Sequence, residues 1–179
     1  MENFIRIYQV NKKICDDLIK YHKLNVEYKA EGTDDSMIVN KDVKESIDVL
    51  FFNPSKNKTI INFFNILGVC ITKYLTEFNL NMRVHTEVGN LIQHYPINGG
   101  FKKFHFENGN ILTKDRKFVY MLYLNDVPDG GTEFKYQEIS LNAKKGDLVI
   151  WPAEFTHTHR GIVSNTKEKY IATGWFKMM

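Results

Sequence analysis

A histidine and a carboxylate stand two residues apart in His105-Phe106-Glu107, directly before the turn-forming pair Asn108-Gly109. Side chains two residues apart in a β-strand point to the same face. If this segment is a strand, the imidazole and the carboxylate converge on one point and can bind a metal ion together. The same spacing also occurs in ordinary strands whose polar side chains are half exposed, so the pair needs further ligands to support a metal site.

A second histidine pair, in His157-Thr158-His159, follows more than fifty positions later. That separation suits opposing strands of a small barrel, which would bring one of these histidines to His105 and Glu107. Two imidazoles and one carboxylate, with open positions opposite, form the site of non-haem Fe(II) oxygenases. Spacing alone leaves His157 and His159 as alternatives, and the unused one would be an ordinary strand histidine with its own hydrogen-bond partner.

The candidate ligands depend on short β-strands for their positions. From Gly89 onward, runs rich in Val, Ile, Tyr, Phe and Thr alternate with Gly, Asn, Asp and Pro, which is typical of an all-β sandwich or barrel. The pattern predicts strands over Gly89–Tyr95, Phe101–Glu107, Lys117–Leu124, Thr132–Leu141, Asp147–Trp151, His157–Val163 and Lys169–Phe176.

The first half of the chain favours helices. Two segments, Asn11–His22 and Thr59–Phe78, place apolar residues at helical spacing, and polar positions make the second a core-packing helix instead of a membrane anchor. Between them, Glu31–Ser46 shows no period and is expected to be a mobile loop. Helices first and strands afterwards predict an α+β, mainly β fold. We expect one domain over residues 1–179, with a helical part over about 1–80 and a β-barrel over about 84–177.

Length and composition limit the class of protein. The chain has 179 residues, the size of one domain, and its 43% hydrophobic and 25% charged residues are ordinary for a soluble globular protein. A net charge of +3, with scattered basic pairs, argues against nucleic acid as a partner. We expect no membrane partner and a cytoplasmic location, because there is no signal core and the apolar stretch Ile66–Ile71 is too short to span a bilayer. Cys15 and Cys70 are expected to be buried thiols.

The order of the motifs resembles the prolyl 4-hydroxylase-like family of Fe(II)- and 2-oxoglutarate-dependent dioxygenases over most of the chain. In that family a tyrosine turn lies ten residues ahead of the first metal histidine, and a basic residue lies ten residues after the second. Between them come a strand ending in Tyr-Leu-Asn, a Gly-Gly turn and a Gly-Asp element. The similar segments here are Tyr95-Pro96-Ile97-Asn98-Gly99 ahead of His105, Tyr123-Leu124-Asn125, Gly130-Gly131-Thr132-Glu133-Phe134, Gly146-Asp147-Leu148, and His159 with Lys169.

This resemblance implies a double-stranded β-helix (jelly-roll) barrel with the N-terminal helices packed outside it. It also implies that His105, Glu107 and His159 are the catalytic iron ligands, which selects His159 over His157. One departure is Glu107, because the family normally has aspartate at this position. Some enzymes of the wider superfamily use His-x-Glu, and a glutamate oxygen is still a hard ligand, so we expect iron binding to be retained.

The resemblance also implies a co-substrate site. Taken alone, Lys169 is a strand-end residue whose ammonium group would extend to water. By resemblance, Lys169 and Tyr123 bind the distal carboxylate of 2-oxoglutarate, and Tyr95 contacts the end nearer the metal. The expected reaction consumes O2, converts 2-oxoglutarate to succinate and CO2, and hydroxylates a C–H bond, with ascorbate as the reductant.

The substrate implied by the resemblance is a protein or peptide, with hydroxylation of a peptidyl proline. Two alternatives stay open at the level of the sequence: the same chemistry on a small molecule or an alkylated nucleobase, and a non-catalytic ligand-binding barrel. The segments Glu31–Ser46 and Asn108–Arg116 are where we expect a substrate-gating lid, because loops on a rigid barrel usually carry recognition.

Overall fold

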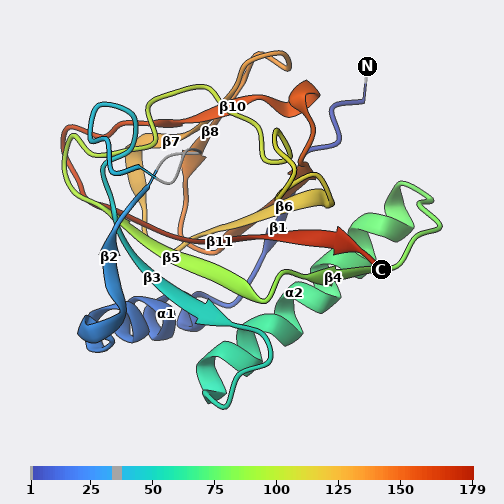
Figure 1. Cartoon of the computed structure of the whole chain (residues 1–179), viewed down its shortest axis with the longest axis horizontal. Helices are drawn as coiled ribbons and strands as arrows, with labels where there is room; N and C mark the ends of the chain where they lie inside the picture. Colours follow the sequence, from blue (N-terminus) through green and yellow to red (C-terminus); the bar gives the residue numbers. More distant parts are fainter. Residues whose placement is uncertain (1, 34–37) are drawn as a thin grey trace.

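Two antiparallel sheets and two helices make up the computed structural model, which describes residues 2–33 and 38–179 (Figure 1). The larger sheet has the spatial order β1 (Arg6–Gln9), β9 (Asp147–Pro152), β6 (Arg116–Tyr123), β11 (Lys169–Met178), β5 (Gly89–Tyr95), β3 (Ile47–Phe52) and β2 (Lys29–Glu31), with β4 (Val84–Thr86) also paired to β11. The smaller sheet has the order β10 (His159–Ile162), β7 (Val127–Phe134) and β8 (Ile139–Ala143). The predicted α+β, mainly β class is confirmed.

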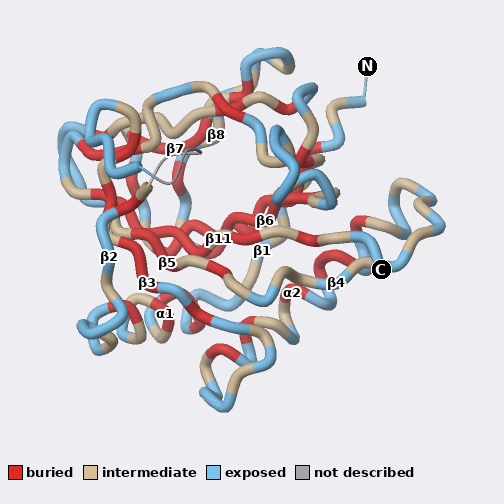
Figure 2. The backbone as a smooth tube through the Cα atoms, in the orientation of Figure 1, coloured by how far each residue is buried: buried red, intermediate tan, exposed pale blue. Residues whose placement is uncertain are grey.

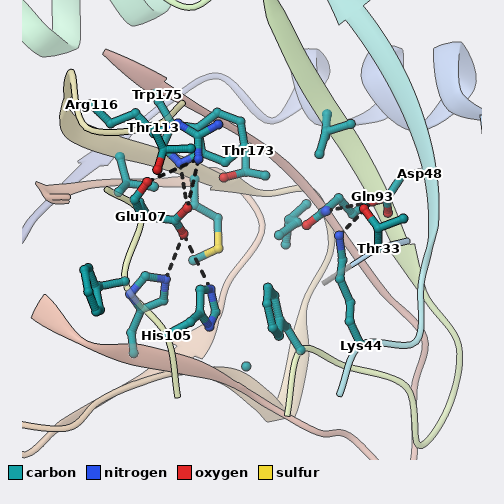
Figure 3. Close-up of a pocket in the computed structure, with 18 of the residues that line it drawn as sticks. Thr33, Lys44, Asp48, Gln93, His105, Glu107, Thr113, Arg116, Thr173 and Trp175 are labelled. Carbon is teal, nitrogen blue, oxygen red and sulfur yellow. Dashed lines mark hydrogen bonds and ion pairs between the residues drawn. The ribbon is translucent and has the colours of Figure 1, made fainter. Parts of the chain in front are cut away.

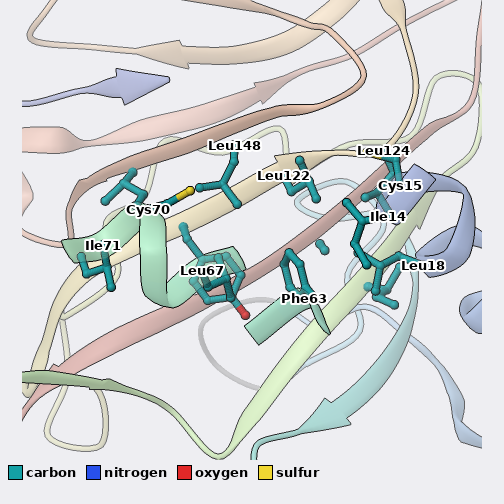
Figure 4. Close-up of a cluster of buried hydrophobic side chains, with 14 of the residues drawn as sticks. Ile14, Cys15, Leu18, Phe63, Leu67, Cys70, Ile71, Leu122, Leu124 and Leu148 are labelled. Carbon is teal, nitrogen blue, oxygen red and sulfur yellow. The ribbon is translucent and has the colours of Figure 1, made fainter. Parts of the chain in front are cut away.

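Both helices, α1 (Lys12–Leu24) and α2 (Lys58–Glu77), lie on one face of the larger sheet (Figure 1). Asn11 and Asn57 cap them, since each side chain accepts a hydrogen bond of 2.9 Å from a backbone N–H two residues on. By length and composition, α2 as a whole could cross a membrane. The sequence prediction considered only the apolar stretch Ile66–Ile71, which is too short to do so. Phe63 and Leu67 of α2 are fully buried against the sheet (Figure 4), so α2 packs as the predicted core helix.

Strand β6 is covered on both faces over its apolar part, Phe118–Tyr123, as a continuous apolar run predicts. Tyr120 and Leu122 belong to the core that the helices share, whereas Met121 and Tyr123 belong to a second core with Trp151. Figure 2 shows the buried backbone along the middle of the larger sheet. The second core therefore lies on the face of the larger sheet that is turned toward the smaller sheet.

Two predicted strands are wrong in detail. The segment Phe101–Glu107 is not a regular strand and makes only isolated bridges, between Lys44 and Phe101 and between His105 and His159. The predicted strand Thr132–Leu141 is divided into β7 and β8 by a tight turn, in which Glu138 has a positive φ of 55°. The turn residues Lys135–Glu138 include no Gly, Pro, Asn, Asp or Ser, so no turn signal in the sequence marked the break.

The expected helical part over about residues 1–80 contains strands as well as helices. Strands β1, β2 and β3 lie there, and β1 pairs with β9 while β3 pairs with β5. Part of the expected loop Glu31–Ser46 is built into the sheet edge: Gly32 N–H donates to Ser46 O at 2.9 Å, and residues 34–37 lie outside the described residues. The cysteine prediction holds, since Cys15 and Cys70 are buried free thiols.

Candidate metal centre

Three side chains predicted as ligands meet between the sheets. One ligand atom from each of His105, Glu107 and His159 lies within 4.8 Å of the others. The Oε1 atom of Glu107 is 3.5 Å from Nε2 of His105 and 3.4 Å from Nε2 of His159 (Figure 3). The structure therefore brings the whole predicted set to one point.

Backbone pairing explains how residues so far apart in sequence meet. His105 and His159 form an antiparallel bridge in which each backbone N–H donates to the other residue's carbonyl at 2.9 Å. Glu107 is held by a further hydrogen bond from its N–H to Ala153 O at 3.0 Å. The segment therefore needs no regular strand, because β10 and the end of β9 provide its partners.

The two imidazoles are oriented as metal ligands. Nδ1 of His105 lies 2.9 Å from Lys103 O, and Nδ1 of His159 lies 2.9 Å from His157 O. A carbonyl only accepts, so Nδ1 carries a hydrogen, and Nε2 is the ring nitrogen that faces Glu107 and that a metal ion would bind. Burial and the neighbouring His105 lower the pKa of His159.

Glu107 has its two carboxylate oxygens in different environments. Oε1 faces the imidazoles, whereas Oε2 accepts a 2.8 Å hydrogen bond from the indole N–H of Trp175. Burial raises the pKa of Glu107, but hydrogen bonds and charge from His105 and His159 outweigh it and hold this pKa well below its ordinary value. Two imidazole nitrogens and one anionic oxygen fit Fe(II) with positions left open.

Lys169 lies in the same cavity and is 4% exposed. Its Nζ donates to Gly131 O at 3.2 Å and to Ile162 O at 3.1 Å, and among the described residues no carboxylate pairs with it. Burial lowers its pKa to about 8. A buried ammonium group without a counter-ion favours an anionic ligand, because an unpaired charge is costly away from water.

The two predicted tyrosines lie beside this ammonium group in different ways. The ring of Tyr95 lines the cavity 5.2 Å from Lys169 Nζ, and its hydroxyl donates to Gln93 Oε1 at 2.7 Å. Tyr123 lies behind the wall and donates its hydroxyl to Thr132 Oγ1 at 2.7 Å. Thr132, which sequence reasoning missed, therefore presents the polar group to the cavity.

The cavity itself has a volume of about 1240 Å³ and runs between the sheets. Both loops expected to gate a substrate contribute to its lining, through Thr33 and Lys44 on one side and Leu112 on another. Figure 3 shows Lys44 with Asp48 and Gln93 on one side and Glu107 with Arg116 and Trp175 on the other. The described parts of these loops thus lie where recognition was expected.

Trp151 and Trp175 both stand in apolar strand segments of the sequence, a setting that predicts core residues. Trp151 is buried in the second core, as expected, and its ring also packs edge-on against His159 at 5.0 Å. Trp175 is only partly buried and binds Glu107, so the prediction missed its place in the site. A tryptophan in an apolar strand carries no sequence signal for such a contact, because the partner lies 68 positions away.

His157, the alternative ligand, lies outside the cluster. It belongs to the short 3-10 turn η2 (Phe155–His157), and its Nε2 lies 2.8 Å from Asn3 O. The turn breaks the alternation that would have placed it on the same face as His159. The structure therefore agrees with the resemblance in selecting His159 for the cluster.

Comparisons with known proteins agree with this geometry. Residues 91–177 match the model of the 2OG-Fe(II) oxygenase superfamily, and no curated protein matches the chain by sequence. A viral collagen prolyl hydroxylase from Paramecium Bursaria Chlorella virus-1, solved with 2-oxoglutarate, is similar with a TM-score of 0.74 and 15% identity, covering 98% of this chain and 97% of that one.

Two further solved structures share the fold. A Pseudomonas putida prolyl-4-hydroxylase has a TM-score of 0.72 at 12% identity, covering 98% of this chain and 91% of its own. A Trichoplax adhaerens prolyl hydroxylase, in complex with a hypoxia inducible factor peptide fragment, has a TM-score of 0.76 at 13% identity, covering 98% and 84%. The matched segment, residues 91–177, contains all three residues of the cluster, so this part of the chain matches the 2OG-Fe(II) oxygenase superfamily, on a fold shared with prolyl hydroxylases.

Proposed function

We propose that this 2-oxoglutarate-dependent dioxygenase hydroxylates a peptidyl proline, with ascorbate as the reductant. The observation that carries the co-substrate part is Lys169, a buried ammonium group without a carboxylate partner among the described residues, in the cavity that holds the His-Glu-His cluster. A dicarboxylate that reaches from the cluster to Lys169 satisfies both ends of this cavity. The proposal assigns that place to 2-oxoglutarate.

His105, Glu107 and His159 would hold Fe(II), and their carboxylate offsets half of its charge. When bound, the iron supplies the oxidation in which O2 and 2-oxoglutarate yield succinate, CO2 and a hydroxylated C–H bond. The hydrogen bonds at both Nδ1 atoms orient the imidazoles before the metal arrives. Aromatic side chains, Trp151 among them, form part of the cavity wall.

Lys169 would bind the distal carboxylate of 2-oxoglutarate in a charge-assisted hydrogen bond. Thr132 offers a hydroxyl beside it, and Tyr123 fixes that hydroxyl by donating to Thr132 Oγ1. Tyr95 adds a ring against the ammonium group. These contacts hold the co-substrate at its unreactive end and leave its keto acid end for the cluster.

The peptide part of the proposal is supported by relatives that share the fold. The similar structures are prolyl hydroxylases, and one of them is in complex with a peptide fragment. The cavity volume of about 1240 Å³ also exceeds the space that a five-carbon diacid fills, so room is left for a substrate side chain.

The test is succinate release by purified protein with Fe(II), ascorbate and 2-oxoglutarate, together with a screen of proline-containing peptides for the mass of one added oxygen. Lys169→Ala should weaken 2-oxoglutarate binding about 10- to 100-fold and leave metal binding in place, because a charged hydrogen bond contributes roughly 1.5–3 kcal/mol. An inactive parent that binds neither metal nor 2-oxoglutarate would support a non-catalytic barrel. Oxygen addition only to small molecules or alkylated bases would overturn the peptide assignment.

A further inference from the structure

We propose that Trp175 is a positioning residue that adapts the site to a glutamate ligand; this rests on the proposed metal site. A glutamate has one more rotatable bond than an aspartate, so its carboxylate can turn and present either oxygen or both to the cluster. Here the indole N–H of Trp175 donates to Oε2 at 2.8 Å. Oε1 alone then faces the two imidazoles, at 3.5 and 3.4 Å.

The positively charged side chain of Arg116 packs against the face of the Trp175 indole ring. The guanidinium carbon of Arg116 lies 3.4 Å from the centre of the Trp175 ring, which fixes the ring plane and makes its N–H a stronger donor. Arg116 also donates to the carbonyl oxygen of Glu107 at 3.3 Å, and its Nη1 pairs with Oε2 of Glu107 at 3.6 Å. One guanidinium group therefore touches both the indole and the residue that the indole binds.

Arg116 is fixed in turn by Glu87. Its Nε and Nη2 donate to the two carboxylate oxygens of Glu87 at 3.0 and 3.1 Å, and Lys177 pairs with the same carboxylate at 3.0 Å. A bidentate pair of this kind sets the direction of the guanidinium plane. The positively charged group over Trp175 thus has little freedom to leave it.

The short strand β4 places Glu87 beside Arg116. It pairs with the end of β11, where Thr86 lies opposite Phe176, and the next residue donates its N–H to Trp175 O at 2.9 Å. A backbone hydrogen bond to Trp175 therefore positions Glu87, and Glu87 in turn positions the guanidinium group of Arg116 that covers the indole ring.

This arrangement has a chemical consequence. A carboxylate bound through both oxygens would use a position on the metal that 2-oxoglutarate or O2 requires. With Oε2 engaged by Trp175, Glu107 is restricted to one ligand atom, Oε1. The longer side chain can then act in place of the family's aspartate without loss of an open position.

Trp175→Phe tests the inference, because it keeps an aromatic ring under Arg116 and removes the N–H. Co²⁺ binding, followed by visible absorption, is measured in the parent and the variant, with thermal unfolding of the metal-free proteins as a check of folding. We expect the affinity for Co²⁺ to fall about 10- to 100-fold, the usual effect of losing a partner of a metal ligand. Tyr74→Phe is the control, since it also removes one buried hydrogen-bond donor, the hydroxyl that donates to Phe4 O at 2.8 Å, but in the core on the helix side of the larger sheet.

A second measurement separates a specific effect from general damage. In a Glu107→Asp background the carboxylate no longer reaches the indole, so adding Trp175→Phe should change Co²⁺ affinity by less than about twofold. Equal losses in both backgrounds, or an equal loss in Tyr74→Phe, would overturn the inference. A parent that binds Co²⁺ but releases no succinate would contradict the proposed function and leave this inference standing, whereas a parent that binds no Co²⁺ overturns both.

Discussion

At the scale of single residues, the cluster separates histidines that the sequence makes look equivalent. His159 Nε2 lies 3.4 Å from Glu107, whereas His157 is bonded to Asn3 O outside the cluster. We predict that His159→Ala abolishes Fe(II) binding and turnover together and that His157→Ala keeps most of the metal affinity. Metal titration of the two variants checks this, and loss of metal only in His157→Ala would show that the ligand is assigned to the wrong histidine.

Glu107→Asp should impair the enzyme instead of restoring the family's usual ligand. The backbone fixes the positions of His105, His159 and Trp175. The shorter side chain of aspartate therefore moves its carboxylate away from all three. A misplacement near 1 Å costs on the order of 100-fold in rate, so succinate release should fall by about that factor. Glu107→Ala is the reference, and Glu107→Asp with more activity than the parent would contradict the prediction.

Lys169 predicts a pH dependence for co-substrate binding. Burial lowers its pKa to about 8, and an anion beside it would raise this pKa again. Below pH 8 the free protein already carries the charged ammonium group, so 2-oxoglutarate affinity should be constant. Above pH 8 binding requires uptake of a proton, and the affinity should fall by up to about tenfold per pH unit.

Isothermal titration with 2-oxoglutarate from pH 6.5 to 9.5 measures this dependence, with buffers of different ionisation enthalpy reporting the proton uptake. Lys169→Arg is the control, because a guanidinium group stays charged over this range and removes the fall in affinity. A parent whose affinity does not change across pH 8 would return Lys169 to a structural role.

At the scale of elements, α2 supports the sheet from which the site is built. Leu67 is fully buried between the helix and the strands (Figure 4). Leu67→Ala should lower the free energy of unfolding by about 2–5 kcal/mol, because the sheet and helix collapse only partly around the cavity that is left. Urea unfolding measures the change.

The matched control is Val69→Ala on the same helix, where the side chain is 57% exposed. It should change the free energy of unfolding by less than about 0.5 kcal/mol. Equal effects of the two substitutions would mean that α2 does not pack through the face that contains Leu67.

At the scale of the whole molecule, the proposed ligands bind between the two sheets. Lys169 belongs to the larger sheet and His159 to the smaller one, so metal and 2-oxoglutarate together would connect the sheets. Each ligand at 100 times its Kd should add about 2.7 kcal/mol to the free energy of unfolding, because it binds only the folded chain.

For a chain of this size, each such increment raises Tm by roughly 5–10 °C. Thermal unfolding with Co²⁺ in place of Fe(II), which avoids oxidation, measures the shift. His105→Ala should show no shift with Co²⁺, and a shift equal to that of the parent would place the metal elsewhere in the molecule.

Local sequence determined those parts of the fold whose patterns are long or closely spaced. The predicted boundaries of β5 are confirmed to the residue, and α2 differs from its predicted range by one residue at each end. The two-residue spacing of His105 and Glu107 was enough to pair them, and the order of motifs selected His159 and Lys169. These features depend on neighbours in the chain or on a spacing that the family shares.

Only the tertiary structure decided the rest, because the determining contacts are distant in sequence. Strands β1, β2 and β4 have three or four residues, too few for a period, and exist through their pairing with β9, β3 and β11. His105 needs no strand of its own because His159 is its backbone partner. Trp175 and Arg116 read as ordinary strand residues until folding places an indole N–H and a guanidinium group against Glu107, a contact that no local pattern encodes.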